Sequence, residues 1–141
     1  MKGVIVRGFP HMPENFHGLR VLVVEDELLI RWAIAETLAQ AGHTVIEAVD
    51  GATAILALKN VRGALDAIVL DYRLPDSNDL TLLATLRRLS PECAVVLMTA
   101  FGTPEIAQGA QDLGVYHVLD KPFEMNDLES LLLEVCSSHG H

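Results

Sequence analysis

Short apolar runs alternate along the chain with longer stretches in which apolar residues recur at helical spacing. The runs predict strands at 20–24, 44–48, 67–70, 94–98 and 115–119. Runs that are apolar throughout are typical of strands covered on both faces. The helical spacing predicts helices at 28–41, 52–60, 79–89, 104–112 and 125–136. The pattern therefore repeats a strand followed by a helix along most of the chain.

Such a repeat favours an α/β fold, a doubly wound (βα)5 domain with a parallel sheet and helices on both faces. Gly42 and Gly114 follow two of the predicted helices, where helix-ending glycines are common. In open sheets of this kind, ligands bind at the carboxyl ends of the strands. We therefore expect the functional residues just after the strands.

One domain is expected over 19–137. Half of the residues are hydrophobic and 21% are charged, which suits a single compact domain with its own core. Residues 1–18 contain closely spaced glycines and prolines and are predicted to form an irregular N-terminal extension, in which Val4-Ile5-Val6 could still add an edge strand. Residues 138–141 are expected to form a C-terminal tail.

Charge and cysteine content exclude several classes of function. The chain has 10 Lys and Arg against 19 Asp and Glu, a net charge of -9, so we expect no direct nucleic-acid binding. Cys93 and Cys136 form neither a disulfide framework nor a CxxC motif. No apolar run reaches the roughly 18 residues that span a bilayer, and the first residues lack the apolar core of a signal peptide. We expect a cytoplasmic protein without membrane contact.

Polar residues of distinct chemistry follow four of the predicted strands. Glu25 and Asp26 follow the first, Asp71 the third, Thr99 the fourth and Lys121 the fifth. Carboxylates gathered at one sheet edge repel one another unless a cation neutralises them, and oxygen ligands without His or Cys suit Mg²⁺, with Mn²⁺ as a substitute. A carboxylate, a hydroxyl and an ammonium group are what phosphoryl transfer requires, with Asp71 as the nucleophile. Any one of these carboxylates alone is more simply explained as a solvated loop residue.

The motifs around these residues also resemble a known family. They are VLVVEDE at 21–27, LDYRLP at 70–75, MTA at 98–100 and KPF at 121–123. In order and spacing they are similar to the receiver domain of two-component response regulators, and the resemblance covers about residues 19–137. It implies a flavodoxin-like sheet with strand order 2-1-3-4-5.

The resemblance also implies a mechanism. Asp71 is expected to be the phosphoacceptor, and a sensor histidine kinase or a histidine phosphotransfer protein is the expected donor. The metal ligands would be Asp26 directly, Glu25 through water, Asp71, and the main-chain carbonyl of Arg73. Transfer would be self-catalysed and Mg²⁺-dependent, so the domain is not expected to be an enzyme with a separate substrate.

Thr99 and Lys121 would hold the phosphoryl oxygens, and Thr99 would also take part in the activation switch. The family further implies a cis Lys121-Pro122 bond, and cis bonds are essentially confined to proline. Activation-dependent contacts, with a downstream protein or a second copy, would form on 104–112, the fifth strand and 125–136.

Two positions depart from the family pattern. Val118 stands where the family usually has an aromatic switch residue, and strand alternation puts only Tyr116 on the same face, so we expect an altered switch or ordinary packing at Val118. Asp79 stands where glycine is common. It either adopts a positive φ or caps the next helix, and we expect the cap.

Other functions fit the residues less well. A haloacid-dehalogenase-like phosphatase also uses a strand-end aspartate with Mg²⁺, but it needs a second aspartate two residues on, where this chain has Arg73. A flavodoxin-like nucleotide binder would need a glycine-rich loop after the first strand, where residues 25–27 are all acidic. Trp32 has two interpretations, a buried core residue or part of a contact patch for the phosphodonor together with Leu28 and Leu29.

Overall fold

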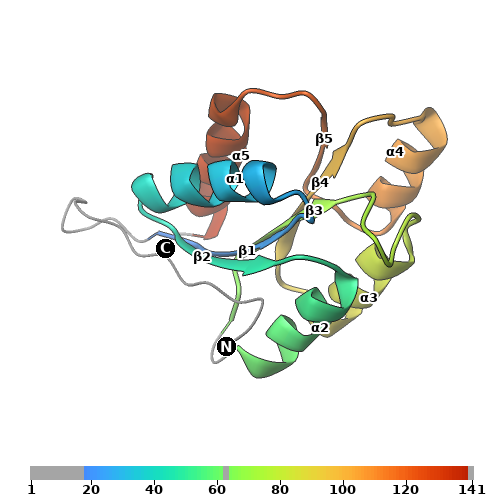
Figure 1. Cartoon of the computed structure of the whole chain (residues 1–141), viewed down its shortest axis with the longest axis horizontal. Coiled ribbons are helices and arrows are strands. Elements are labelled where there is room, and N and C mark those ends of the chain that lie inside the picture. Colours follow the sequence, from blue (N-terminus) through green and yellow to red (C-terminus); the bar gives the residue numbers. More distant parts are fainter. Residues whose placement is uncertain (1–17, 62–63, 140–141) are drawn as a thin grey trace.

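A computed structural model describes residues 18–61 and 64–139 of the chain. Strands and helices alternate along it (Figure 1). They are β1 (Arg20–Val24), α1 (Leu28–Gln40), β2 (Thr44–Ala48), α2 (Gly51–Asn60), β3 (Ala67–Asp71), α3 (Thr81–Leu89), β4 (Ala94–Thr99), α4 (Pro104–Asp112), β5 (His117–Asp120) and α5 (Met125–His139). The strand and helix repeat expected from the apolar pattern is confirmed.

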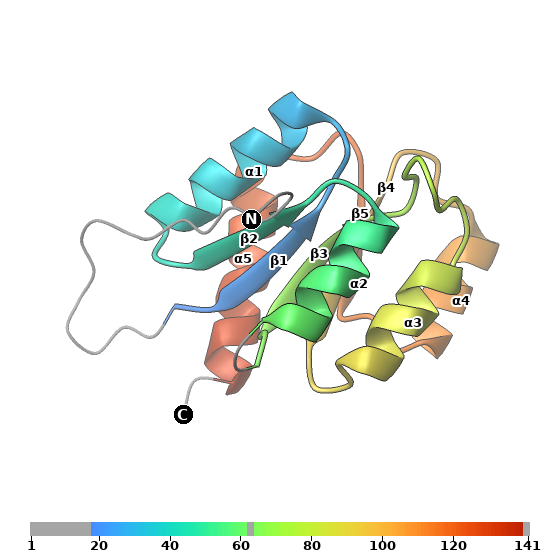
Figure 2. The ribbon, with the colours of Figure 1, turned by 60° about the horizontal axis from the view of Figure 1, so that its bottom comes forward.

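The strands form one parallel sheet in the order β2-β1-β3-β4-β5. Figures 1 and 2 show α1 and α5 against one face of the sheet and α2, α3 and α4 against the other. The doubly wound α/β fold and the strand order 2-1-3-4-5 are therefore confirmed. Because all strands run the same way, their carboxyl ends meet at one edge of the sheet.

Each face of the sheet has its own apolar core. Leu22, Ile68 and Leu97 point toward α2, α3 and α4, whereas Val23 and Val69 point toward α1 and α5. This division follows from the pleat, since successive side chains of a strand face opposite sides. Covering both faces explains why the strands read as continuous apolar runs.

The fifth strand begins later than expected, at His117 rather than at residue 115. Val115 N–H donates to the carbonyl of Ala110, so this residue belongs to the turn that ends α4. Gly114 has a φ of 80° in that turn, which glycine adopts without strain. The strand in turn extends to Asp120, one residue past the predicted end.

β1, β2 and α4 have the predicted bounds, and the remaining elements apart from β5 differ from them by one to three residues at one end. α3 begins at Thr81 rather than 79, because Asp79 Oδ1 accepts a hydrogen bond of 2.9 Å from Thr81 N–H. No non-glycine residue of the described segments has a positive φ, so that interpretation of Asp79 is wrong. The N-cap position is Leu80, and Asp79, one residue earlier, supplies an acceptor for the first N–H group of the helix. α5 continues to His139, into the expected tail. The possible strand at 4–6 lies outside the described residues. None of the described helices is long and apolar enough to cross a membrane.

Candidate functional site

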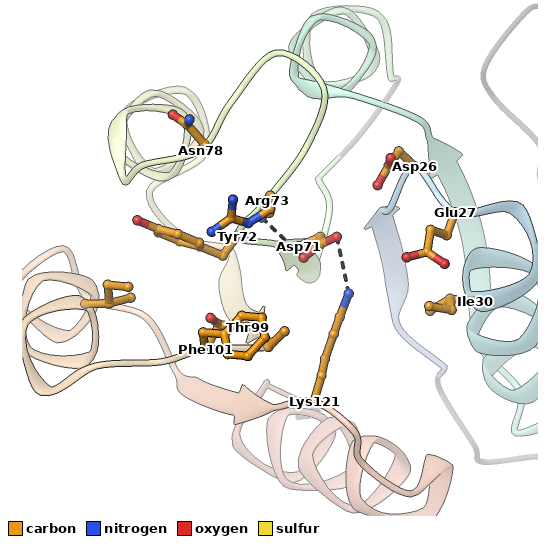
Figure 3. Close-up of a pocket in the computed structure, with 12 residues that line it drawn as sticks. Asp26, Glu27, Ile30, Asp71, Tyr72, Arg73, Asn78, Thr99, Phe101 and Lys121 are labelled. Carbon is orange, nitrogen blue, oxygen red and sulfur yellow. Dashed lines mark hydrogen bonds and ion pairs between the residues drawn. The ribbon is translucent and has the colours of Figure 1, made fainter.

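Three carboxylates converge at the carboxyl edge of the sheet. Glu25 and Asp26 follow β1, and Asp71 is the last residue of the neighbouring strand β3. One carboxylate oxygen of each residue lies within 4.8 Å of the others. Glu25 and Asp71 are buried and Asp26 is exposed. Figure 3 shows Asp71 in the centre of the site, with Asp26 above the end of the adjacent strand. The predicted acidic residues are thus brought together.

Lys121 reaches into this cluster from the loop after β5. Its Nζ donates to Glu25 Oε1 at 2.9 Å. The same atom lies 3.2 Å from Asp71 Oδ2, the contact that Figure 3 shows as a dashed line. Its main-chain N–H donates to the carbonyl of Thr99 at 2.8 Å, which ties the loop to the end of β4. The Lys121-Pro122 bond is cis, as the sequence resemblance implied. Lys121 therefore supplies a positive charge between two buried carboxylates.

Burial dominates the electrostatics of Glu25. It raises the pKa of this carboxyl to about 7, against the opposing effects of the Glu27 N–H and the Lys121 ammonium, and the charge of Asp71 adds to the increase. Burial on its own would lower the pKa of Lys121, but the ion pairs with Glu25 and Asp71 outweigh it and leave the pKa above its ordinary value. Burial thus favours the neutral form of Glu25, and the charged form of Lys121 is stabilised by its two carboxylate partners.

These residues suit a hard divalent cation. The carboxylates offer only oxygen ligands, and excess negative charge at short separation is what a cation would relieve. Asp71 Oδ1 accepts a hydrogen bond of 3.3 Å from Arg73 N–H, which links the aspartate to the start of the loop that carries Arg73. Arg73 lines the same cavity, and its main-chain carbonyl remains a predicted ligand.

A cavity of about 410 Å³ lies directly above Asp71. Thr99, buried at the end of β4, lines this cavity together with Lys121 and Asp26. Phe101 forms part of its rim and is 79% exposed. The cavity therefore gives a small anionic group access to the Asp71 carboxylate, with a hydroxyl and an ammonium group beside it.

Val118, the predicted switch position, packs against the apolar core of the domain. It is half-buried, on the α2, α3 and α4 face of the sheet. The hydroxyl of Tyr116 donates to Glu134 Oε1 of α5 at 3.1 Å, which holds this ring at the surface.

Trp32 is 51% exposed, so the interpretation of this residue as buried is wrong. Its role as a contact residue stays a prediction.

Sequence reasoning missed an aspartate that anchors the loop after Asp71. The Asp76 carboxylate accepts hydrogen bonds from the main-chain N–H groups of Gly51 at 2.9 Å and Ala52 at 3.0 Å. It thereby caps the N-terminus of α2 from another segment of the chain. A Cβ at position 51 would lie 3.2 Å from Asp76 Oδ1 and 3.0 Å from Leu82, so a larger residue would crowd both side chains. Asp76 lies 25 residues from Gly51, so no local sequence pattern could predict that it caps α2.

Comparisons with known proteins point to one family. The family model described as the response regulator receiver domain matches residues 21–133. The transcriptional regulatory protein TcrA of Mycobacterium tuberculosis is 37% identical over 111 residues, which cover 79% of this chain and 43% of TcrA. The chain thus spans less than half the length of this curated relative.

Solved structures agree with this assignment. NtrX from Brucella abortus is 30% identical with a TM-score of 0.77, and the match covers 86% of this chain and 27% of NtrX. The chemotaxis response regulator CheY4 of Vibrio cholerae is 27% identical with a TM-score of 0.75, and the match covers 84% of this chain and 99% of CheY4. Both the fold and the sequence are therefore similar to those of response regulators.

Proposed function

The chain belongs to the receiver domains of two-component response regulators, and from this premise we propose that it accepts a phosphoryl group on Asp71. The donor is the phosphohistidine of a sensor histidine kinase or a histidine phosphotransfer protein, and the reaction depends on Mg²⁺. One observation carries the proposal: three carboxylates and Lys121 converge on a cavity that opens above Asp71.

Phosphoryl transfer replaces one bond to phosphorus by another. An Asp71 carboxylate oxygen attacks the phosphorus in line with the leaving imidazole. The new P–O bond forms as the P–N bond breaks, and the imidazole nitrogen leaves with the electron pair. Because Asp71 is held at the end of a fully buried strand, its carboxylate is oriented before the donor arrives.

The surrounding residues stabilise the charge that the phosphoryl oxygens carry. Glu25, Asp26, Asp71 and the Arg73 carbonyl would hold Mg²⁺, which when bound neutralises carboxylate and phosphoryl charge. The Lys121 ammonium, 3.2 Å from Asp71 Oδ2, pairs with one phosphoryl oxygen. The Thr99 hydroxyl donates to another. All of these groups belong to the domain, so the transfer is self-catalysed.

Phosphorylation then alters partner contacts. A phosphoryl group on Asp71 attracts Thr99 and Lys121, which precede α4 and α5 along the chain. The surface formed by α4, β5 and α5 is therefore the proposed contact face for a downstream protein or a second copy of the chain. The exposed side chains of Leu28, Leu29 and Trp32 lie at the start of α1, beside Asp26, and form the proposed contact patch for the donor.

Mass spectrometry of the intact protein after incubation with acetyl phosphate tests the proposal. With Mg²⁺ we expect one phosphoryl adduct, and we expect none in Asp71→Asn or when EDTA removes the metal. Asp26→Ala should weaken Mg²⁺ binding and block adduct formation. Glu92→Ala serves as a matched control, because Glu92 is an exposed carboxylate before β4, away from the site. An adduct that persists in Asp71→Asn, or rapid turnover of varied phosphomonoesters, would overturn the proposal.

A further inference from the structure

Arg31 is a charged residue buried beside the acidic site. It lies in α1, and 8% of its surface is exposed. Its Nε donates to Glu47 Oε1 on β2 at 3.0 Å, and its Nη1 donates to the main-chain carbonyl of Glu25 at 3.0 Å. Glu47 is itself buried. The guanidinium group therefore links α1, β2 and the end of β1.

The contact with the Glu25 carbonyl fixes a particular peptide group, the one that joins Glu25 to Asp26. On the other side of Glu25, its N–H donates to the carbonyl of Ala48 on β2 at 3.1 Å. Because a peptide group is planar, holding its carbonyl restricts the rotation on both sides of it. Arg31 and Ala48 thus hold the main chain immediately before the exposed Asp26.

The ion pair alone does not explain why these residues are charged. Two buried charges lose their hydration, and apolar residues of similar size often stabilise a fold equally well. An apolar side chain cannot, however, donate a hydrogen bond to the Glu25 carbonyl. A guanidinium group donates in two directions from one rigid plane, which allows Glu47 to hold it while it binds the carbonyl.

We propose that Arg31, held by Glu47, is a positioning residue that orients Asp26 for a divalent cation. The inference rests on the proposed function, in which Glu25, Asp26 and Asp71 bind Mg²⁺. Partners of metal ligands that do not touch the metal commonly contribute 10-fold to 100-fold to metal affinity. We expect about a tenfold contribution from Arg31, since it acts through the backbone and not on the carboxylate itself.

Isothermal titration calorimetry with Mg²⁺ alone measures this contribution directly. The main variant is Arg31→Met/Glu47→Leu, which removes both charges together and leaves no unpaired ion in the core. It should unfold cooperatively yet bind Mg²⁺ about tenfold more weakly than the unaltered chain. Arg31→Lys keeps the charge beside Glu47 but replaces the planar fork by an ammonium group, and it should weaken binding severalfold.

Arg87 provides a matched control on the opposite side of the sheet. Its guanidinium group also donates to two main-chain carbonyls, those of Leu113 at 3.1 Å and Cys93 at 2.6 Å. Arg87→Met should therefore lower stability without changing the Kd for Mg²⁺. This comparison separates a positioning role from a general loss of packing.

The outcomes distinguish this inference from the function on which it rests. Mg²⁺ binding within twofold of the unaltered chain, in both Arg31→Lys and a folded Arg31→Met/Glu47→Leu, overturns the positioning role. An equal loss of Mg²⁺ affinity in Arg87→Met overturns it as well. If instead the unaltered chain binds no Mg²⁺, or Asp26→Ala binds it as tightly as the unaltered chain, the proposed metal site itself is wrong.

Discussion

Nζ of Lys121 lies 2.9 Å from Oε1 of Glu25, so a hydrogen bond joins the loop after β5 to the end of β1 across 96 positions of sequence. The carboxylate is completely buried, and the same ammonium group lies 3.2 Å from Oδ2 of Asp71, the proposed phosphoacceptor. Burial favours the neutral form of Glu25, whereas the ammonium group favours the charged form. The balance between them makes the site sensitive to pH near neutrality.

The first prediction concerns that pH dependence. Glu25 has a pKa of about 7 in the folded chain and an ordinary value of 4.5. Between these values the folded state holds a proton that the unfolded state has lost, so the contribution of Glu25 to stability falls as pH rises, by at most about 1.4 kcal/mol per pH unit. Affinity for Mg²⁺ should rise over the same window, because the metal competes with the proton for this carboxylate.

Urea unfolding at several pH values between 5 and 8 tests the sign. The variant Glu25→Gln cannot titrate at this position. Its free energy of unfolding should therefore increase relative to that of the unaltered chain as pH rises. Comparing the two proteins removes the titration of groups that do not interact with Glu25. A difference between them that stays constant, or that shrinks with rising pH, would contradict the assignment of the raised pKa to Glu25.

The second prediction concerns the aspartate that caps α2 from the loop after β3. Asp76→Ala should lower the free energy of unfolding by about 1–2 kcal/mol, because two main-chain N–H groups at the start of the helix lose their acceptor. Asp76→Asn keeps one acceptor oxygen and should cost less. Chemical denaturation measures both variants, with Glu92→Ala as a control that should stay within about 0.5 kcal/mol. Equal stability of Asp76→Ala and the control would show that the cap contributes nothing.

The third prediction concerns the lifetime of the phosphoryl group. Hydrolysis needs a water molecule in line with the aspartyl-phosphate bond, and Phe101, at the rim of the cavity, has no polar atom to orient one. Arg73 lines the same cavity but stays protonated and is a poor base. We therefore expect slow self-dephosphorylation, and severalfold faster loss in Phe101→Ala and Arg73→Asn.

Phosphate loss is timed after removal of acetyl phosphate. Leu89→Ala is the control, since Leu89 is also an exposed apolar residue but lies at the end of α3. If neither Phe101→Ala nor Arg73→Asn loses phosphate faster than this control, water exclusion by these side chains is not what sets the lifetime.

The fourth prediction concerns position 118. Val118 lines a cavity of about 670 Å³ between α4 and β5 that also contacts Tyr116. A tyrosine introduced at this position has room to occupy that space in one state of the domain and to leave it in another. Val118→Tyr should therefore change the self-association of the phosphorylated form, measured by sedimentation velocity, more than that of the unphosphorylated form. Equal changes in both forms would indicate that the residue only packs.

Much of the fold follows from patterns that the sequence displays locally. Strands covered on both faces are mostly apolar, which is why the bounds of β1 and β2 could be predicted. The start of β5 was misplaced because Val115 is apolar like the strand but closes the turn after α4. Apolar character predicts burial, and it does not report which backbone partner a residue takes.

The candidate site also contains some residues that could be predicted from the sequence and others that could not. Residues that directly follow strands were predictable, since parallel strands deliver them to one edge. Arg31 and Asp76 were missed because their partners lie 16 and 25 residues away. One signal was available: Glu47 sits within an otherwise apolar strand, and a buried carboxylate requires a partner. The identity of that partner depends on how α1 packs across the sheet.

The position of Asp71 in the sheet has a mechanical consequence. β3 is hydrogen-bonded to β1 on one side and to β4 on the other, and all of its residues are buried. We therefore expect the strand to stay in place if its last side chain gains volume and charge. Any displacement would then occur in the loops beyond the strand ends, and the stiffness of these loops would limit how far a change at Asp71 is transmitted.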